Sequence, residues 1–448
     1  MNTFKTLALS AAALATTGLA QAQTTIYLVA SNGDRGPTQN AIGHLLAAGG
    51  NTWTYQGVGG SASGNSTTAG VGSPANSNYG AWKGKFQGQD VIIQTNYAGA
   101  LTGISAVAGD TPQRFVASDG SGSGSVPDPT TATNPALYQT GIADIGLSTN
   151  FQSTSPFRGL YNGHLYNTIV EEKVGVSALV FVASPGFPAD NITTQQAQAL
   201  YKTGYLSLAV FTGNPTDESK FVFALGRNQD AGQRYGSYGE FGLGTNTAVK
   251  VYQPVITGQL TQPDTNYKYG GVAGSHILFP VAVTPGGIDS VIPGNGGYTT
   301  ANDLAPSLTV TLGENAYKLY DPEIEDYTLP DATGGYYIGY VTPNDFTNRI
   351  LPFGGTLLKY NGVAYSTANI QNGLYTPWIY NRLLRRVGSG AAAFTGTPDE
   401  KNLKAAFYTA LRDQIKNTDA LVGGGIQLDS NFKVGRSTDG GAVYPLYY

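Results

Sequence analysis

Short apolar runs, each followed by a small polar turn, recur along the chain. Runs of this kind are typical of buried strands whose ends meet surface loops. The run at 174–183 has almost no polar interruption, which is expected when both faces of a sheet are covered. The strands predicted in this way are 24–30, 90–97, 142–148, 174–183, 221–225 and 336–341.

Between these strands, apolar positions recur at helical spacing. This spacing covers 38–46 and 192–201, and the second of these helices is predicted to start at Thr193 or Thr194. The clearest helix is 399–416, with one apolar face. The alternation of strands and helices predicts an α/β architecture with parallel sheets.

Other stretches lack such a pattern. Glycine and serine dominate 57–79 and 119–135, which predicts exposed loops. Between 249 and 311 the pattern loosens into short strands and Gly/Pro turns, and the sequence does not place these elements. Asn361-Gly362 predicts the turn of a hairpin within 357–363.

The N-terminus has the pattern of a secretory signal peptide. Lys5 precedes a short alanine-rich apolar region, and a small-x-small cleavage pattern ends at Ala22. No cysteine occurs, which excludes a lipoprotein anchor cysteine, disulfides and thiolate metal sites. We therefore expect residues 1–22 to be removed and the mature chain to be periplasmic or secreted, held together by a substantial core.

The charge balance limits the class of partner. Lys and Arg total 25 and Asp and Glu total 29, which gives a formal net charge of −4. Nucleic-acid phosphates require clustered cations, so we expect no nucleic-acid partner. His44, His164 and His276 lie far apart and lack metal-ligand spacing. We expect no metal and no cofactor, and a monomeric protein.

Catalytic patterns are weak. Glu171-Glu172 and the acidic run 321–326 suggest the paired carboxylates of a glycosidase, but clustered acids ordinarily form solvated faces. A Gly-x-Ser-x-Gly elbow with a plausible partner and a P-loop are both absent. We expect no catalytic residues and no enzymatic activity.

The segment 221–236 carries the most distinctive pattern. An apolar strand leads to Arg227, a polar glycine-bearing turn follows, and a helix is predicted to begin near Gln233. A helix N-terminus and a guanidinium group both favour anions, through free N–H groups, the helix dipole and a planar donor fork. The alternative is an arginine in a surface salt bridge beside an ordinary turn.

Several segments, in the correct order and spread over most of the mature chain, resemble the phosphate-type substrate-binding proteins of bacterial ABC transporters. Asn96–Ile104 looks like the family's Y-x-G-x-G-S-G-x-G-I loop, Ala143–Asn150 resembles V-D-F-G-A-S-D, and Gly226–Gln233 is similar to R-x-D-G-S-G-T. Val174–Leu200 resembles an apolar strand followed by N-P and L-T-x-x-Q-L-x-x-I-F, Tyr337–Val341 matches A-I-G-Y-V, and Asn361–Tyr375 looks like G-V-x-P-T-x-x-N-I-x-x-G-x-Y-P.

The resemblance implies a two-lobed periplasmic-binding-protein fold of the second structural type. The lobes would be joined by two crossovers, near Val174 and near 342–348. Residues 23–173 with 349–448 would form a discontinuous first lobe, and 174–348 the second. The resemblance also implies a small, phosphate-like oxyanion in the interlobe cleft and an ABC permease in the inner membrane as partner.

The candidate ligand-binding residues lie at strand ends and helix starts. They are Ser31, Asn32, Gly33, Thr102, Gly103, Ser148, Thr149, Arg227, Gly232 and Gln233. Most could equally be turn or helix caps. Asp34 and Arg35 are expected to form an ion pair at the cleft rim. The aromatic residues Tyr375, Trp378 and Tyr380 are expected to pack in the core rather than line the cleft.

The chain also departs from the family pattern. Ala231-Gly-Gln233 replaces the S-G-T donor turn, and Ser148-Thr149 replaces Ser-Asp, so two hydroxyl donors and one carboxylate are lost. Two interpretations remain open. The first is a periplasmic binding protein for a small oxyanion, and the second is a structural or adhesive envelope protein on a scaffold that has lost its ligand. A secreted hydrolase on this scaffold is the weakest alternative.

Overall fold

A computed structural model describes residues 23–65, 74, 77–244, 247–255, 275–278, 294–310, 317–321, 326–332 and 335–446. The predicted signal peptide and parts of the predicted loop 57–79 and of 249–311 lie outside the described residues. Within the described part, no helix combines the length and apolar character that a membrane span requires.

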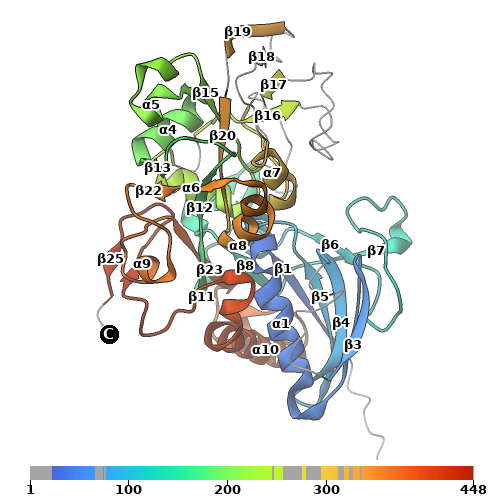
Figure 1. The fold of residues 1–448 in the computed structure, drawn as a ribbon. Coiled ribbons are helices and arrows are strands. Elements are labelled where there is room, and N and C mark those ends of the chain that lie inside the picture. The colour runs from blue at the N-terminus through green and yellow to red at the C-terminus, as the bar shows by residue number, and fades with distance from the viewer. Residues whose placement is uncertain are drawn as a thin grey trace, which may run out of the picture.

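Two lobes of mixed α/β structure are stacked along the long axis of the molecule (Figure 1). The larger lobe is built on an eight-stranded sheet of order β11-β23-β8-β1-β5-β4-β2-β3. Its strands are β1 (Thr24–Ala30), β2 (Trp53–Gly57), β3 (Gly60–Gly64), β4 (Tyr79–Phe86), β5 (Gln89–Asn96), β8 (Ile145–Ser148), β11 (Ile169–Ala178) and β23 (Trp378–Arg386).

Helices cover both faces of this sheet. Successive residues of β1 point to opposite faces, and apolar residues on each face pack against a helix. Ile26 and Leu28 pack with α1 (Arg35–Ala47) and α10 (Pro398–Asn417). Val29 packs on the other side with α3 (Ala100–Ala108). The carboxyl ends of β1, β5 and β8 therefore share one edge, since these strands run parallel.

The smaller lobe contains a five-stranded sheet of order β14-β15-β20-β12-β21. Its strands are β12 (Val180–Ala183), β14 (Tyr205–Ser207), β15 (Phe221–Ala224), β20 (Gly335–Val341) and β21 (Thr356–Leu357). Its helices are α4 (Thr194–Thr203), α5 (Ala209–Thr212), α6 (Gly232–Glu240), α7 (Ala301–Ser307), α8 (Pro343–Asp345) and α9 (Thr367–Gln371). Thr193 caps α4 in a capping box with Gln196, as the sequence predicts.

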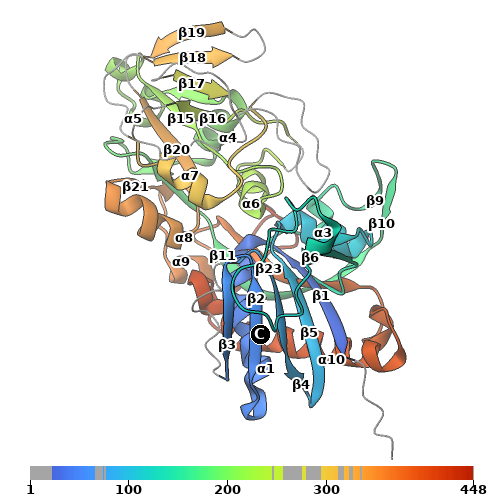
Figure 2. The ribbon, with the colours of Figure 1, turned by 90° about the vertical axis from the view of Figure 1, so that its right-hand side faces the viewer.

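Smaller sheets complete the molecule. The four strands β16 (Tyr252–Val255), β17 (Ser275–Leu278), β18 (Tyr317–Asp321) and β19 (Asp326–Ala332) form a separate sheet at the far end of the smaller lobe (Figure 2). Two-stranded sheets pair β6 (Gln113–Val116) with β7 (Tyr138–Gly141), β9 (Gly159–Tyr161) with β10 (His164–Tyr166), β13 (Asn191–Ile192) with β22 (Lys359–Tyr360), and β24 (Val434–Gly435) with β25 (Tyr444–Pro445).

The predicted strand 174–183 is in fact two strands. β11 ends at Ala178 in the larger sheet and β12 begins at Val180 in the smaller one, so the chain changes lobe at Leu179. The Leu179 N–H donates to the Pro377 carbonyl at 3.0 Å. A nearly continuous apolar run is therefore buried in both lobes, and it carries no mark of the crossing.

The chain returns to the larger sheet between β21 and β23, because β21 still pairs with β12 of the smaller sheet. The division of the chain at 173/174 and 348/349 stays a prediction. β23 buries Trp378 and Tyr380, and Tyr375 is also buried, so these three aromatic residues lie in the core.

Two expectations about local structure were wrong. The sheets are mixed rather than parallel, because β4 and β5 are joined by a tight turn and pair antiparallel, as do β11 and β23. Part of the predicted loop 57–79 is a strand, β3, paired with β2. The predicted loop 119–135 contains no strand, and a 3-10 helix (Pro135–Leu137) begins at its last residue.

Candidate functional site

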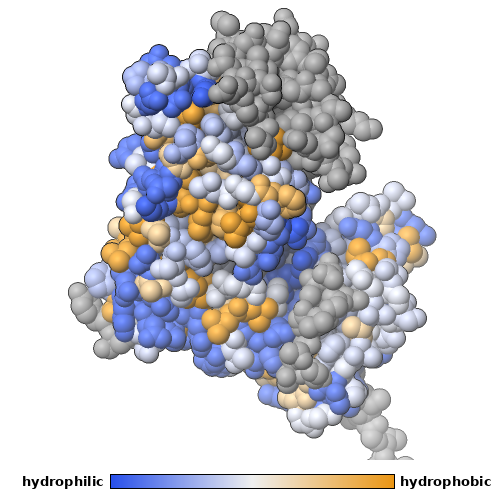
Figure 3. Space-filling view, viewed as in Figure 1, coloured by the Kyte–Doolittle hydropathy of each residue, from blue (hydrophilic) through white to orange (hydrophobic). Residues whose placement is uncertain are grey.

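A cavity of about 360 Å³ lies between the two lobes. The larger lobe contributes the turns that follow β1, β5 and β8, and the smaller lobe contributes the turn after β15 and the starts of α6, α7 and α8. Hydrophilic and apolar residues both lie at the surface near this junction (Figure 3). Ligands of open α/β sheets bind at this edge, beyond the carboxyl ends of the strands.

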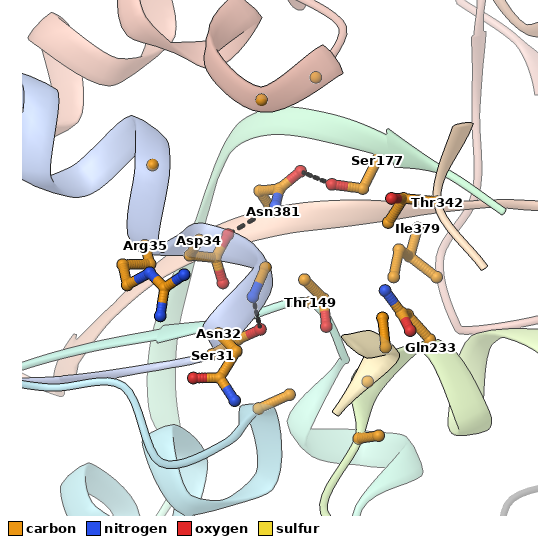
Figure 4. Close-up of a pocket in the computed structure, with 18 of the residues that line it drawn as sticks. Ser31, Asn32, Asp34, Arg35, Thr149, Ser177, Gln233, Thr342, Ile379 and Asn381 are labelled. Atoms are coloured by element: carbon orange, nitrogen blue, oxygen red, sulfur yellow. Dashed lines mark hydrogen bonds between the residues drawn. The ribbon is translucent and has the colours of Figure 1, made fainter. Parts of the chain in front are cut away.

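Most of the residues predicted as ligand contacts line this cavity. They are Ser31, Asn32, Gly33, Thr149, Arg227, Gly232 and Gln233. They come from three separate segments of the two lobes, which follow β1, β8 and β15, and in the close-up Thr149 and Gln233 lie next to each other (Figure 4). Their role in binding a ligand stays a prediction.

The other three predicted residues do not line the cavity. Ser148 is buried, and its Oγ accepts the Asn150 N–H at 3.0 Å. Gly103 packs on β8 so closely that an added Cβ would lie 2.3 Å from the Leu147 carbonyl oxygen. Thr102 is directed at the carboxylate of Asp230. Each has a structural partner in place of open space.

Two of the helix starts that line the cavity are capped differently. Ser31 Oγ accepts the Gly33 N–H at 3.0 Å in the single turn η1 (Asn32–Asp34), which leads directly into α1. At α6, the N-cap residue Ala231 offers no side-chain cap. The Arg234 N–H donates to the Ala231 carbonyl at 3.0 Å. The N–H groups of Gly232 and Gln233 precede it in the first turn, where a helix provides no partner, so they are the donors that the start of α6 offers to the cavity.

The guanidinium of Arg227 donates hydrogen bonds to residues in and next to the cavity wall. Its Nε donates to the Tyr298 carbonyl at 3.1 Å, and its two terminal nitrogens donate to Gln233 Oε1 at 2.6 Å and the Thr299 carbonyl at 2.9 Å. It is only 6% exposed, so the alternative of a surface salt bridge is wrong. Burial lowers the pKa of this guanidinium from its ordinary value.

Three polar atoms at the cavity wall lack hydrogen-bond partners among the described residues. They are Thr149 Oγ1, Asn32 Oδ1 and Asp34 Oδ2. Thr149 is 4% exposed and Asp34 1% exposed. Buried polar groups ordinarily have partners, so such atoms mark a place where water or a ligand completes the bonding.

Asp34 and Arg35 do not form the expected ion pair. Asn381 donates to Asp34 Oδ1 from β23, and Arg35 donates to Asn78 Oδ1. Burial raises the pKa of Asp34 to about 7, against the opposing effects of Asn381 and the Arg382 charge. The cavity thus contains a carboxyl group that titrates near neutrality.

Three further residues that line the cavity were not predicted from the sequence. They are Asp230, Asp345 and Asn381, and of these only Asp230 lies in a segment that resembles a family motif. Asn381 lies inside β23, a strand that the sequence did not predict, and nothing in the local pattern marks it. Within the described ranges, no group of three or more His, Cys, Asp or Glu side chains is placed to hold a metal ion.

The two lobes approach each other closely at Gly232. A Cβ at this position would lie 1.7 Å from Thr149 Oγ1, across the interlobe junction. We expect Gly232→Ala to lower the free energy of unfolding by about 1–3 kcal/mol, because such overpacking forces one lobe to move. Gly33→Ala is the matched control, since its Cβ would meet nothing nearer than 3.4 Å. Equal stability of the two variants in urea denaturation would contradict this assignment.

No protein-family model matches the chain, and no curated protein sequence matches it. Among solved structures, the chain is similar to an ABC-type phosphate transport receptor from Vibrio cholerae, with 12% identity over 64% of this chain and 80% of the receptor, at a TM-score of 0.35. It is also similar to a putative phosphate ABC transporter substrate-binding protein from Clostridium perfringens, with 10% identity over 90% of this chain and 100% of that protein, at a TM-score of 0.37. A possible phosphate-binding protein from Planctomyces limnophilus is similar at 10% identity and a TM-score of 0.34, over 88% of this chain and 99% of that one.

Proposed function

We propose that the chain is a periplasmic or secreted solute-binding protein that captures a small, phosphate-like oxyanion between its lobes. The observation that carries the proposal is the pairing of an unpartnered, buried Thr149 hydroxyl with the uncapped start of α6 across one cavity. Free N–H groups and a helix dipole favour an anion at this position, and a hydroxyl adds a further donor.

The cavity is lined by both positive and acidic side chains. Arg35 and Arg227 line it, but so do Asp34, Asp230 and Asp345. A protonated Asp34 would donate a hydrogen bond to an oxyanion, whereas an ionised one would repel it. Anion affinity is therefore expected to fall as the pH rises through about 7. An ABC permease would be the partner of such a protein, and the proposal includes no catalytic step.

The experiment is a thermal unfolding series of the mature protein with sodium phosphate, and with sodium chloride at equal ionic strength as control. Binding to the native state alone raises stability by about 2.7 kcal/mol at a hundredfold excess over Kd. We expect phosphate to raise the unfolding temperature, and Thr149→Val to remove most of the rise. A panel of phosphate, sulfate and molybdate without effect would overturn the proposal.

The envelope-scaffold interpretation also has an observation in its favour. Asp230 fills the start of α3, and Arg227 is already bonded to carbonyl and amide oxygens, so two of the predicted ligand contacts are occupied by the protein itself. A failed anion panel would favour this second function.

A further inference from the structure

The start of α3 in the larger lobe holds a carboxylate that belongs to the smaller lobe. Asp230 Oδ1 accepts the Thr102 N–H at 3.0 Å, and Asp230 Oδ2 accepts the Thr102 hydroxyl at 2.8 Å. The Ala100 N–H donates to the Asp230 carbonyl at 3.2 Å. The first turn of α3 is thus satisfied by one residue that lies 128 positions away in the sequence from Thr102.

The fit around this carboxylate is close. Asp230 is 3% exposed. A Cβ on Gly99, the N-cap residue of α3, would lie 1.9 Å from Asp230 Oδ2, so the carboxylate occupies the space that any other residue at 99 would fill. Two oxygens on backbone N–H and hydroxyl donors at a helix start form the arrangement that such a helix offers to a free oxyanion.

The carboxylate is held by neutral donors more than by a counter-charge. Burial raises the pKa of Asp230 to about 6, while hydrogen bonds from Thr102 and the Leu101 N–H lower it, and the charge of Arg227 contributes least of the causes. Arg227 directs its guanidinium to Gln233 and two carbonyls. The carboxylate is therefore bound as an anion by neutral donors at the start of α3, and it is not half of a salt bridge. We call this group of donors, the Thr102 hydroxyl and the N–H groups of Leu101 and Thr102, the anion seat.

We propose that Asp230 is a built-in ligand that determines the specificity of the cavity: its carboxylate fills the anion seat at the start of α3 and restricts an external solute to the side formed by η1, Thr149 and α6. Removal of the side chain opens the seat to a small carboxylate or tetrahedral oxyanion. The same contact joins the lobes when no solute is present, because Asp230 and Thr102 belong to different lobes. The effect of Asp230 on specificity rests on the proposed function, whereas its contact with Thr102 between the lobes does not.

Chemical rescue tests the proposal. Asp230→Ala should unfold at a lower temperature than the unchanged protein, and sodium acetate should restore part of the loss, with a rise of about 3 °C or more at saturation. The unchanged protein and Asp230→Asn, in which a neutral side chain still fills the seat, should gain nothing from acetate. Asp217→Ala is the matched control, because Asp217 accepts from the Thr212 hydroxyl at 2.8 Å within the smaller lobe alone.

Adding Thr102→Val to Asp230→Ala should abolish most of the acetate effect, since it removes the hydroxyl donor. An acetate response that is equal in Asp230→Ala and Asp217→Ala, or that survives Thr102→Val unchanged, would overturn the proposal. The two proposals fail separately: phosphate stabilisation of the unchanged protein tests the proposed function, whereas acetate rescue of Asp230→Ala tests the seat. If Asp230→Ala does not fold, a Thr102→Val variant that is as stable as the unchanged protein would overturn the inference.

Discussion

Replacing Asp439 with alanine is expected to lower the free energy of unfolding by about 3–5 kcal/mol, the largest loss expected of any single substitution proposed for this protein. Asp439 lies on the C-terminal segment and is buried, and its backbone packs against Gly239 of α6 in the smaller lobe. Its Oδ2 accepts the Phe151 N–H at 3.0 Å and the Thr154 hydroxyl, and its Oδ1 lies 3.8 Å from a terminal nitrogen of Arg382.

Arg382 makes this loss severe. Its guanidinium is fully buried, and its three nitrogens have no hydrogen-bond partner in the part of the chain that the structure describes. It lies 3.3 Å from the centre of the Phe151 ring, so a cation–π contact supports it beside Asp439. Without Asp439, a buried charge would lose its nearest counter-charge, and the pKa of Arg382, already lowered by burial, would fall further.

Urea denaturation measures this effect. Asp429→Ala is the control in the same segment, because Asp429 only caps its own exposed turn at Asn431. That change is expected to alter stability by about 0.5 kcal/mol or less. The double variant Arg382→Met, Asp439→Ala should be more stable than Asp439→Ala alone, since it removes the uncompensated charge. If Asp439→Ala is no less stable than the Asp429 control, the buried pair does not support the lobe junction.

Asp34→Asn is expected to remove a pH dependence of stability that spans pH 4 to 7. An ordinary aspartate titrates near 3.8, and burial raises the pKa of Asp34 to about 7. In this interval the folded protein holds a proton that the unfolded chain releases. The stability associated with this carboxyl is therefore fully present below about pH 4 and is lost as the pH rises to about 7.

The size of the effect follows from the shift. A difference of about three pKa units corresponds to about 4 kcal/mol at most. The variant keeps an oxygen for the Asn381 amide, and its new amide replaces Oδ2, which has no partner among the residues described. We expect Asp34→Asn to equal the unchanged protein in stability at pH 4 and to exceed it at pH 7.5.

Denaturation at these two pH values provides the measurement. Asp345→Asn is the control at the same cavity, because Asp345 already accepts the Thr342 hydroxyl at 2.7 Å and pairs with Arg349. A stability difference between Asp34→Asn and the unchanged protein that is the same at pH 4 and pH 7.5 would show that Asp34 does not titrate as argued.

The sequence by itself determined the local elements and the general architecture. Hydrophobic patterning placed β1, β5, β15, β20 and α10 to within a residue or two, because a buried strand or a helix face requires a regular apolar pattern whatever its neighbours are. Strand ends followed by small polar residues marked seven residues of the cavity wall, since the carboxyl ends of parallel strands meet at one edge. The phosphate-like ligand and the lobe boundaries stay predictions.

Only the tertiary structure decided which groups face the cavity and which are already bonded. Asp230 reaches Thr102, Asp34 meets Asn381, and Asp439 approaches Arg382 across separations that no sequence window contains. The sequence also did not show that the chain changes lobe at Leu179, because burial in either lobe requires the same apolar residues. A local pattern records what each segment buries, whereas the partner of a polar side chain, and so its pKa and its freedom to bind a ligand, depends on residues that folding brings from elsewhere.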